Sequence, residues 1–344
     1  MNAPMAVDTK QQDQALAGHS REELLDLHHL MLLNRRFEEK VGEMYTRAKV
    51  GGFLHLNIGE EATFVGAIKA LRPGDYVYST YREHGHAISH GVDPKRVMAE
   101  LFGRVDGTSR GRGGSMHLFD PEKRFMGGYA IVAGSIALAV GTAMAVQYRD
   151  GDEVVMSIFG DGATNNGTFH ESLNLAKVWN LPVLFVCVNN QYGMGSAVER
   201  VSAVKEMYRK AWGYDIPAER VDGMDIVAVL DAARAAAQSI RDEKTPYFLE
   251  AVTYRYRGHS MADPQVYRSK EEVEEWRKRD AIEGFRHRLR EAGIASDDDF
   301  DAHEKDVERI VQEAVDFADA SPEPDPSTDL TQDVYAGDLP VTWR

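Results

Sequence analysis

The amino-acid sequence predicts an α/β protein in which a parallel β-sheet carries helices on both faces. The prediction rests on three continuous apolar segments that we expect to be strands, at residues 153–159, 181–188 and 247–256. Helical segments near 167–178 and 226–241 lie between them. Continuous apolar strands joined by helices are typical of parallel sheets that are buried on both faces. Ligands of such sheets bind beyond the carboxyl ends of the strands, so the loops after these strands are the expected sites of chemistry.

The segment before these strands is predicted to contain three helices. Residues 21–48 place apolar side chains on one side of a helix, and Ser20 with Glu23 forms a capping signal at its start. A second helix is expected over residues 60–71, where an Arg-Pro-Gly sequence ends it. A third, rich in Ala and Gly, is expected within residues 131–146. This stretch is shorter than the ~20 residues that a membrane-spanning helix needs, so no membrane association is expected.

Charged helices and an acidic tail are predicted to follow the sheet. The helices are expected at roughly 269–292 and 302–319, and the Pro/Asp-rich sequence SPEPDPSTD after them is expected to be an extended arm. We therefore predict a flexible segment over residues 1–20, one domain over 21–320 that includes these helices, and an acidic Pro-rich tail over 321–344.

The charge of the chain argues against a nucleic-acid partner. Its 344 residues include 55 acidic and 40 basic side chains, a formal net charge of −15. Residues 296–344 hold 11 Asp and 4 Glu against 1 Lys and 2 Arg, so most of the negative charge lies at the C-terminal end. Nucleic-acid binding needs a basic face, which this distribution does not offer. A small phosphorylated ligand needs only local donors and is compatible with it.

The cysteine content and the N-terminal sequence predict a cytoplasmic protein. Cys187 is the only cysteine, which excludes an intramolecular disulfide and a multi-cysteine metal site and favours a reducing compartment. Because it lies in an apolar segment, we interpret it as a buried structural thiol. Residues 1–20 lack the basic start and apolar core of a signal peptide and the arginines of a mitochondrial presequence.

Two polar loops follow two of the predicted strands. The first reads GDGATNNG, from Gly160 to Gly167, and the second reads NNQYGMG, from Asn189 to Gly195. Either loop alone would be an ordinary turn. Together they place a carboxylate (Asp161), an amide (Asn190) and a main-chain carbonyl at neighbouring strand ends, where magnesium completes its shell with phosphate oxygens and water. The glycines let an anion approach the main chain.

Other phosphate-binding motifs are absent from the sequence. There is no GxxxxGK[ST] sequence, and no GxGxxG stands between a strand and a helix, so a P-loop and a dinucleotide-binding fold are excluded. The RGRGG sequence at residues 110–114 is interpreted as a glycine-lined nest or hinge rather than as an RNA-binding element.

The two loops resemble the thiamine diphosphate motif, which opens with GDG and closes with NN. Over roughly residues 25–320 the chain resembles the alpha subunit of the thiamine-dependent first component of 2-oxo acid dehydrogenase complexes, among them pyruvate dehydrogenase and the related acetoin dehydrogenase. Further motifs carry the resemblance: TYREHGH at 80–86, GRGGSMH at 111–117, YGMGSAVER at 192–200, RVDGMD at 220–225 and YRYRGHSMADP at 254–264.

The resemblance implies a thiamine diphosphate-binding fold, specifically its diphosphate-binding domain, and a set of site residues. Magnesium would be held by Asp161, Asn190 and the carbonyl of Tyr192. Arg82 and Tyr81 would hold the diphosphate, since a guanidinium fork and a phenolic hydroxyl suit phosphate oxygens. The other implied cofactor contacts are the main chain of Gly162 and Ala163, the apolar wedge Met194, the pyrimidine neighbours Ala130 and Val132, and His259.

Two histidines are implied to be catalytic. His259, in the GHSMADP loop, would stabilise or protonate intermediates and assist acyl transfer, and His84 would assist in the substrate channel. The sequence departs from the family pattern at residues 130–133, which read Ala-Ile-Val-Ala where the family commonly has Gly-Ile-Val-Gly. The family's serine is kept as Ser260, but a regulatory phosphorylation is not carried over with it.

The resemblance also implies partners and an activity. The motifs and helices leave no room for a pyrimidine-binding domain, so a beta subunit is expected to supply the pyrimidine-activating glutamate, with two copies of each chain. The implied activity is oxidative decarboxylation of pyruvate, with transfer of the acetyl group to a lipoyl group on an acyltransferase core. Acetoin, suggested by GATNNGTFHESLNLA, or a branched 2-oxo acid is an alternative substrate, and a non-catalytic paralogue is an alternative of another class.

Overall fold

The computed structural model describes residues 16–330 and residue 332 of the chain. Its centre is a six-stranded sheet in the order β2-β1-β3-β4-β8-β7, in which every neighbouring pair is parallel. The predicted α/β class with a parallel sheet is therefore confirmed. The strands are β1 (Tyr76–Thr80), β2 (Phe125–Tyr129), β3 (Val155–Gly160), β4 (Val183–Asn189), β7 (Ala218–Asp222) and β8 (Tyr247–Val252). A separate two-stranded ribbon consists of β5 (Tyr192–Gly193) and β6 (Ser196–Ala197).

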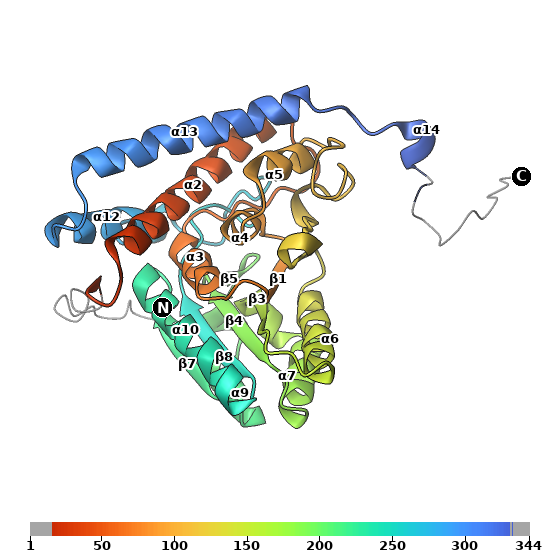
Figure 1. Ribbon diagram of the computed structural model, residues 1–344, viewed down its shortest axis with the longest axis vertical. Helices are drawn as coiled ribbons and strands as arrows, with labels where there is room; N and C mark the ends of the chain where they lie inside the picture. Colours follow the sequence, from red (N-terminus) through yellow and green to blue (C-terminus); the bar gives the residue numbers. More distant parts are fainter. Residues whose placement is uncertain (1–15, 331, 333–344) are drawn as a thin grey trace, which may run out of the picture.

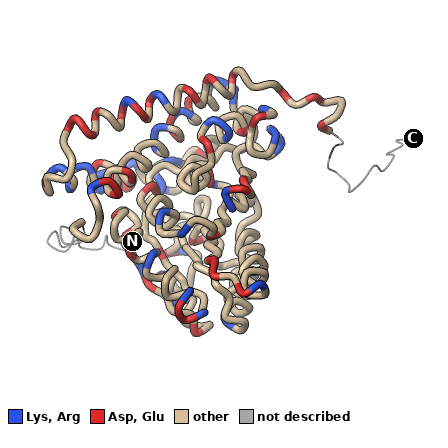
Figure 2. Tube along the Cα trace, in the orientation of Figure 1, with Lys and Arg blue, Asp and Glu red and all other residues tan. Residues whose placement is uncertain are grey.

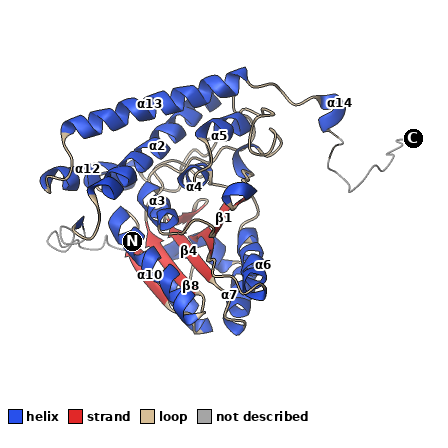
Figure 3. Cartoon of the chain, viewed as in Figure 1, coloured by secondary structure: helices blue, strands red, loops and turns tan. Residues whose placement is uncertain are grey.

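Helices cover both faces of the sheet (Figures 1 and 3). Side chains of the central strands alternate between two apolar cores: Met156 and Val186 belong to the first, and Val155 and Phe185 to the second. Cys187 is buried in the second core, as expected of a structural thiol. The first core includes α3 (Glu61–Lys69) and α10 (Ile226–Glu243), and the second includes α6 (Gly134–Tyr148) and α7 (Gly167–Val178).

Two long helices pack side by side across the top of the molecule in Figure 1. They are α2 (Arg21–Thr46) and α13 (Asp297–Ala320), and α13 also contacts α5 (Pro94–Leu101). The predicted cap of α2 is present, because the Ser20 side chain accepts a hydrogen bond from the Glu23 N–H. Basic residues of α2 and α5, together with Lys49, form ion pairs with acidic residues of α13, and Figure 2 shows where the charged residues lie along these helices. The ion pairs are Arg21–Asp299, Arg36–Glu304, Lys49–Asp319 and Lys95–Glu313.

Two expectations for the C-terminal region are wrong. The helix expected over 269–292 is two helices, α11 (Lys270–Arg277) and α12 (Ala281–Glu291), because Asp280 leaves the helical conformation and its side chain caps α12. The arm expected to be extended contains a short helix, α14 (Pro326–Asp329), with Asp325 as its cap. The remainder of the predicted tail, and residues 1–15 of the predicted N-terminal segment, lie outside the described residues.

The other α-helices among the described residues are short: α4 (His84–Ser89), α8 (Val198–Val201) and α9 (Tyr208–Ala211). Across the part of the chain that the structure describes, no helix is both long enough and apolar enough to span a membrane.

Candidate active site

A cavity of about 240 Å³ lies at the carboxyl edge of the sheet. It is formed where the loops after β1, β3 and β4 meet the segment after β8 and the turn before α6. Its position agrees with the expectation that chemistry follows the strands. Of the predicted site residues, those lining it are Tyr81, Arg82, Val132, Asp161, Gly162, Ala163, Asn190, Tyr192 and Met194.

Asp161 follows β3 directly and lines the cavity. The residue is 3% exposed, and burial raises the pKa of its carboxyl group to about 7, although the Arg255 guanidinium opposes the shift. The two polar loops approach closely here, because a Cβ on Gly162 would lie 3.3 Å from the Cα of Gly193. Burial makes the charged form of this carboxyl group costly, and a cation bound beside it would stabilise that form.

Asn190 follows β4 and is paired with Glu60, a residue that the sequence motifs do not assign. The Asn190 Nδ2 donates a hydrogen bond of 2.7 Å to Glu60 Oε1. Glu60 is buried and lines the cavity, and burial raises the pKa of its carboxyl group against the opposing effect of Arg82 and Arg255. The sequence pattern placed Glu60 only at the start of a predicted helix. The feature that could have identified it as a cavity residue is its charge, beside the apolar face of α3.

Arg255 is a second cavity residue that the motifs do not assign. Its guanidinium is fully buried and donates hydrogen bonds to the carbonyls of Tyr192 at 3.3 Å and Met194 at 3.2 Å, and to the Tyr267 hydroxyl at 3.2 Å. It therefore holds the loop that carries the predicted Tyr192 ligand. The signal in the sequence was an arginine inside the otherwise aromatic and apolar run that continues β8.

Arg82 and Tyr81 follow β1 and line the cavity as a pair. The Arg82 guanidinium is buried and donates to the carbonyls of Leu56 at 2.6 Å and His259 at 2.7 Å. The ring of Tyr81 packs against His55, with centroids 4.7 Å apart. Positive charge is thus fixed beside the cavity by main-chain acceptors, and the assignment of both residues to a diphosphate stays a prediction.

His259 lies beside Tyr81 but does not itself line the cavity. Its ring meets that of Tyr81 at 5.6 Å and that of His55 at 5.1 Å, both edge to face. Burial, and then the charges of Arg82 and Arg255, lower the pKa of His259 to about 4, so the imidazole is neutral at pH 7. Its main-chain N–H donates to Asp263 at 2.6 Å, which holds the loop independently of the imidazole.

His84 is buried away from the cavity in a chain of three polar side chains. Its Nδ1 lies 3.0 Å from Glu38 Oε2 and its Nε2 lies 2.9 Å from Ser115 Oγ. The structure therefore does not bring His84 to the predicted site, and its catalytic role stays a prediction. His86, which no motif interpretation assigned, lines the cavity instead, and burial lowers its pKa to about 3.

The turn before α6 forms the exposed rim of the cavity. Ile131 and Val132 are 76% and 46% exposed, and Met194 on the facing loop is 64% exposed. Ala133 is buried with a φ of 68°, a conformation that suits glycine and that an alanine adopts at a cost. Ala130 precedes this turn but is not among the lining residues.

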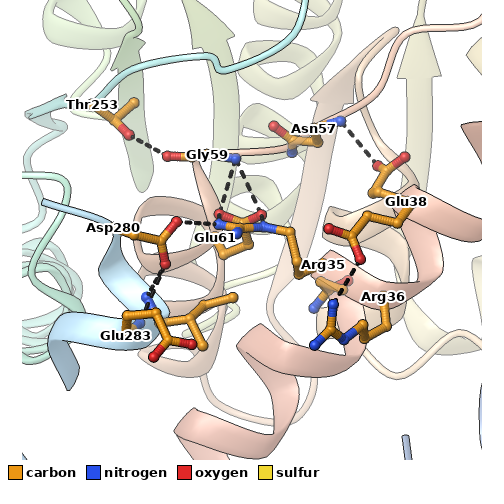
Figure 4. A network of polar contacts seen from close by, with 12 residues as sticks. Arg35, Arg36, Glu38, Asn57, Gly59, Glu61, Thr253, Asp280 and Glu283 are labelled. Atoms are coloured by element: carbon orange, nitrogen blue, oxygen red, sulfur yellow. Dashed lines mark hydrogen bonds and ion pairs between the residues drawn. The ribbon is translucent and has the colours of Figure 1, made fainter. Parts of the chain in front are cut away.

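A polar network around Glu61 fixes the segment at the start of α3, next to Glu60 (Figure 4). Glu61 accepts hydrogen bonds from the Gly59 N–H at 3.1 and 3.0 Å and from Arg35 at 2.5 and 2.9 Å. Arg35 also donates to Asp280 at 2.9 Å. The network thereby ties α2 and the start of α12 to the wall of the cavity.

Within the described ranges, no three His, Cys, Asp or Glu side chains come together in an arrangement that could hold a metal ion. A metal at this site would need other oxygen ligands. The Asn190 amide and the Tyr192 carbonyl are such ligands, and a bound phosphate would supply more.

Comparison with known proteins identifies the family. The family model described as the dehydrogenase E1 component matches residues 29–327. The chain is 47% identical over 313 residues to the pyruvate dehydrogenase E1 component subunit alpha of Rhizobium meliloti (strain 1021), covering 91% of this chain and 90% of that protein. It is 45% identical over 312 residues to the protein of that name from Porphyra purpurea, covering 89% and 91% of the two chains. For the protein of that name from Rickettsia conorii the identity is 41% over 313 residues, with 91% and 96% covered. The chain belongs to the dehydrogenase E1 component family.

Proposed function

We propose that this chain is the alpha subunit of a pyruvate dehydrogenase first component, which decarboxylates pyruvate and passes the acetyl group to a lipoyl group. The observation that carries the proposal is 40–47% identity to several proteins of that name over about nine-tenths of the chain. The predicted site residues that gather around one cavity support it further.

The family implies thiamine diphosphate as cofactor, and we propose Mg²⁺ as its metal. The residues fit such a pair, because a buried carboxylate with a raised pKa favours a cation while two buried guanidinium groups favour an anion. Asp161, Asn190 and the Tyr192 carbonyl would hold the metal. When bound, the cofactor supplies an electron sink for cleavage of a carbon–carbon bond beside a carbonyl.

The chain's own residues would orient the reactants and move protons. Arg82 would hold a phosphate group while its bond to the His259 carbonyl keeps the histidine loop in place. The neutral His259 imidazole, which packs against the cavity residue Tyr81, can accept a proton at one nitrogen and return it. The apolar rim of Ile131, Val132 and Met194 would exclude water once a partner covers it.

The assembly is part of the proposal. A beta subunit would supply the glutamate that activates the pyrimidine ring, in a complex of two alpha and two beta chains, and a lipoyl-bearing acyltransferase core would accept the acyl group. A cytoplasmic location is also proposed, because Cys187 is the only cysteine of the sequence and this favours a reducing compartment.

A turnover comparison tests the substrate. The chain is assembled with its beta subunit, and the rates on pyruvate, a branched 2-oxo acid and acetoin are measured with lipoamide as acceptor. We expect the highest kcat/KM for pyruvate. A higher kcat/KM for acetoin would favour an acetoin dehydrogenase, the alternative that GATNNGTFHESLNLA suggests. If the complex binds the cofactor but turns over none of the three substrates, the chain is a non-catalytic paralogue.

A further inference from the structure

Glu60 is a buried carboxylate in the cavity that touches one of the proposed metal ligands. It is 3% exposed, and its Oε1 accepts the 2.7 Å hydrogen bond from Asn190 Nδ2. Asn190 would bind a magnesium ion through its amide oxygen, since Mg²⁺ takes oxygen ligands. An amide carries its oxygen and its NH₂ group on opposite sides, so the residue that holds the NH₂ group decides where the oxygen points.

The main chain is fixed on both sides of Glu60, and Figure 4 shows the contacts of Gly59, which precedes it. On its N-terminal side, the Gly59 N–H is bound by Glu61 and the Gly59 carbonyl accepts a hydrogen bond of 3.2 Å from Thr253. A Cβ at Gly59 would lie 2.4 Å from the Tyr254 carbonyl, so this close approach requires glycine. On its C-terminal side α3 begins immediately.

We propose that Glu60 is a positioning residue that keeps the Asn190 amide oxygen directed toward the metal. The proposal rests on the proposed function, because it needs the magnesium ion that this function requires. A flipped amide would place its oxygen against the carboxylate oxygen and lose the hydrogen bond. The oxygen on the other side accepts only a long contact of 3.4 Å from the Tyr192 N–H, which leaves it able to take a metal ion.

Two substitutions separate positioning from charge. The full alpha chain with Glu60→Leu or Glu60→Gln is assembled with its beta subunit, and Mg²⁺ is titrated at saturating thiamine diphosphate while binding is followed by calorimetry. Glu60→Leu is expected to raise the half-saturating Mg²⁺ concentration about 10–100-fold, as for other residues that orient metal ligands. Glu60→Gln keeps an oxygen that can accept the same hydrogen bond and should stay within about threefold of the wild type. Glu308→Leu, at an exposed position of α13, is the matched control and should change nothing.

The outcomes distinguish this inference from the proposed function. An equal loss of Mg²⁺ affinity in the Leu and Gln variants would show that the charge of Glu60 matters rather than its hydrogen bond. Unchanged Mg²⁺ affinity in the Leu variant would show that Glu60 has no role in binding the metal. Either result overturns the positioning role of Glu60 and leaves the proposed function standing. If the Leu variant does not assemble, Glu60→Met keeps the side-chain length and carries the same expectation. A wild-type complex that binds the cofactor without magnesium overturns the proposed metal, and the positioning role with it.

Discussion

Asp161 brings a buried carboxyl group to a cavity that the buried residues Arg82 and Arg255 also line. Its carboxyl group is buried at a strand end and its pKa is raised to about 7, so the charged form is costly without a cation. Arg255 and Arg82 lie around the same cavity, but their guanidinium groups are engaged with main-chain carbonyls. The cavity therefore combines a carboxyl group, which a cation would stabilise in its charged form, with two guanidinium groups held in fixed positions. This arrangement suits a metal ion bound to an anionic ligand.

Removing this carboxylate should abolish cofactor binding without harming the fold. Asp161→Ala takes away a proposed metal ligand, so the dissociation constant for thiamine diphosphate in the presence of Mg²⁺ should rise by more than about 100-fold. The cofactor-free melting temperature should not fall, because the substitution also removes the cost of burying the carboxyl group. Calorimetry and thermal unfolding of the assembled protein measure the two effects. Asp301→Ala, on the exposed surface of α13, is the control, and tight binding by the Asp161 variant would refute its assignment.

His259 should affect transfer rather than binding. His259→Ala leaves the main-chain N–H that donates to Asp263 and the carbonyl that accepts from Arg82, so the loop and the guanidinium keep their positions. We expect unchanged cofactor affinity and a loss of about 10²–10⁴-fold in acetyl transfer to lipoamide, the usual contribution of a proton-transfer group. Single-turnover assays with lipoamide, run beside calorimetry, separate the two. Loss of cofactor affinity equal to that of Asp161→Ala would contradict this role.

The sequence predicts those residues that follow strands in recognisable motifs. Asp161 and Asn190 come directly after β3 and β4, which are adjacent in the sheet, so their proximity follows from the strand order. Glu60 and Arg255 reach the same cavity from other parts of the chain. Their approach depends on how the segment before α3 packs against the end of β8, and no local pattern carries that information.

At the scale of elements, the unpredicted strands are those with little apolar character. β2 and β7 are the two edges of the sheet, and β7 reads AERVD with one buried residue. β1 is interior but has only five residues and reads YVYST. Continuous apolar runs mark strands with neighbours on both sides and helices on both faces, so β3, β4 and β8 were predicted while shorter or edge strands were not.

The glycine-rich loop after α5 is held by one internal carboxylate. Glu100 is fully buried, and its two oxygens accept hydrogen bonds of 2.7 to 3.0 Å from four main-chain N–H groups. The donors are the N–H groups of Ser109, Gly111, Gly113 and Gly114. The predicted glycine-lined nest is thus confirmed, and its anion is a side chain of the same chain. The loop continues to Ser115, whose hydroxyl meets His84.

Breaking this nest should open the loop selectively. In Glu100→Gln the amide NH₂ group cannot accept a hydrogen bond, so two of the four N–H groups lose their acceptor, at a cost of roughly 2–4 kcal/mol in loop stability. Hydrogen exchange at residues 109–114 should therefore accelerate more than tenfold, while exchange in β3 and β4 stays unchanged. Glu122→Gln, at a nearby exposed site, is the control. Unchanged exchange in the loop would mean that its glycine packing, rather than Glu100, maintains it.

At the scale of the whole molecule, the negative charge and the active site lie apart. Acidic residues of α13 form ion pairs with basic residues of α2 and α5 and with Lys49, along the helices at the top of Figure 2. The cavity lies elsewhere, at the carboxyl edge of the sheet. Four acidic residues of α13 are therefore paired with basic residues of the same chain, at a distance from the cavity. The sequence predicted the uneven distribution, but not which basic residues would face it.

Large apolar side chains are exposed on α6, the helix that begins at the cavity rim, and on α7. On α6 the side chains of Leu138, Met144 and Tyr148 are 46%, 50% and 90% exposed, and on α7 Val178 is 63% exposed. The two helices contact each other, and large apolar side chains exposed on neighbouring helices are typical of surfaces that another chain covers. Since α6 begins at the rim turn, a partner on this face would also close the cavity.

We therefore expect the beta subunit to cover α6, and a charge there to prevent assembly. Leu138→Glu should weaken association of the alpha and beta chains by at least about tenfold, because it buries an unpaired carboxylate in an apolar interface. The same variant should lose magnesium-dependent cofactor binding at low protein concentration and regain it as the concentration of beta subunit rises, since the proposed metal ligands are unchanged. Analytical ultracentrifugation and calorimetry at several beta concentrations measure both effects, with Lys305→Glu on α13 as the control. Normal assembly by Leu138→Glu would place the partner on another face, and cofactor binding by the alpha chain alone would remove the need for a partner in forming the site.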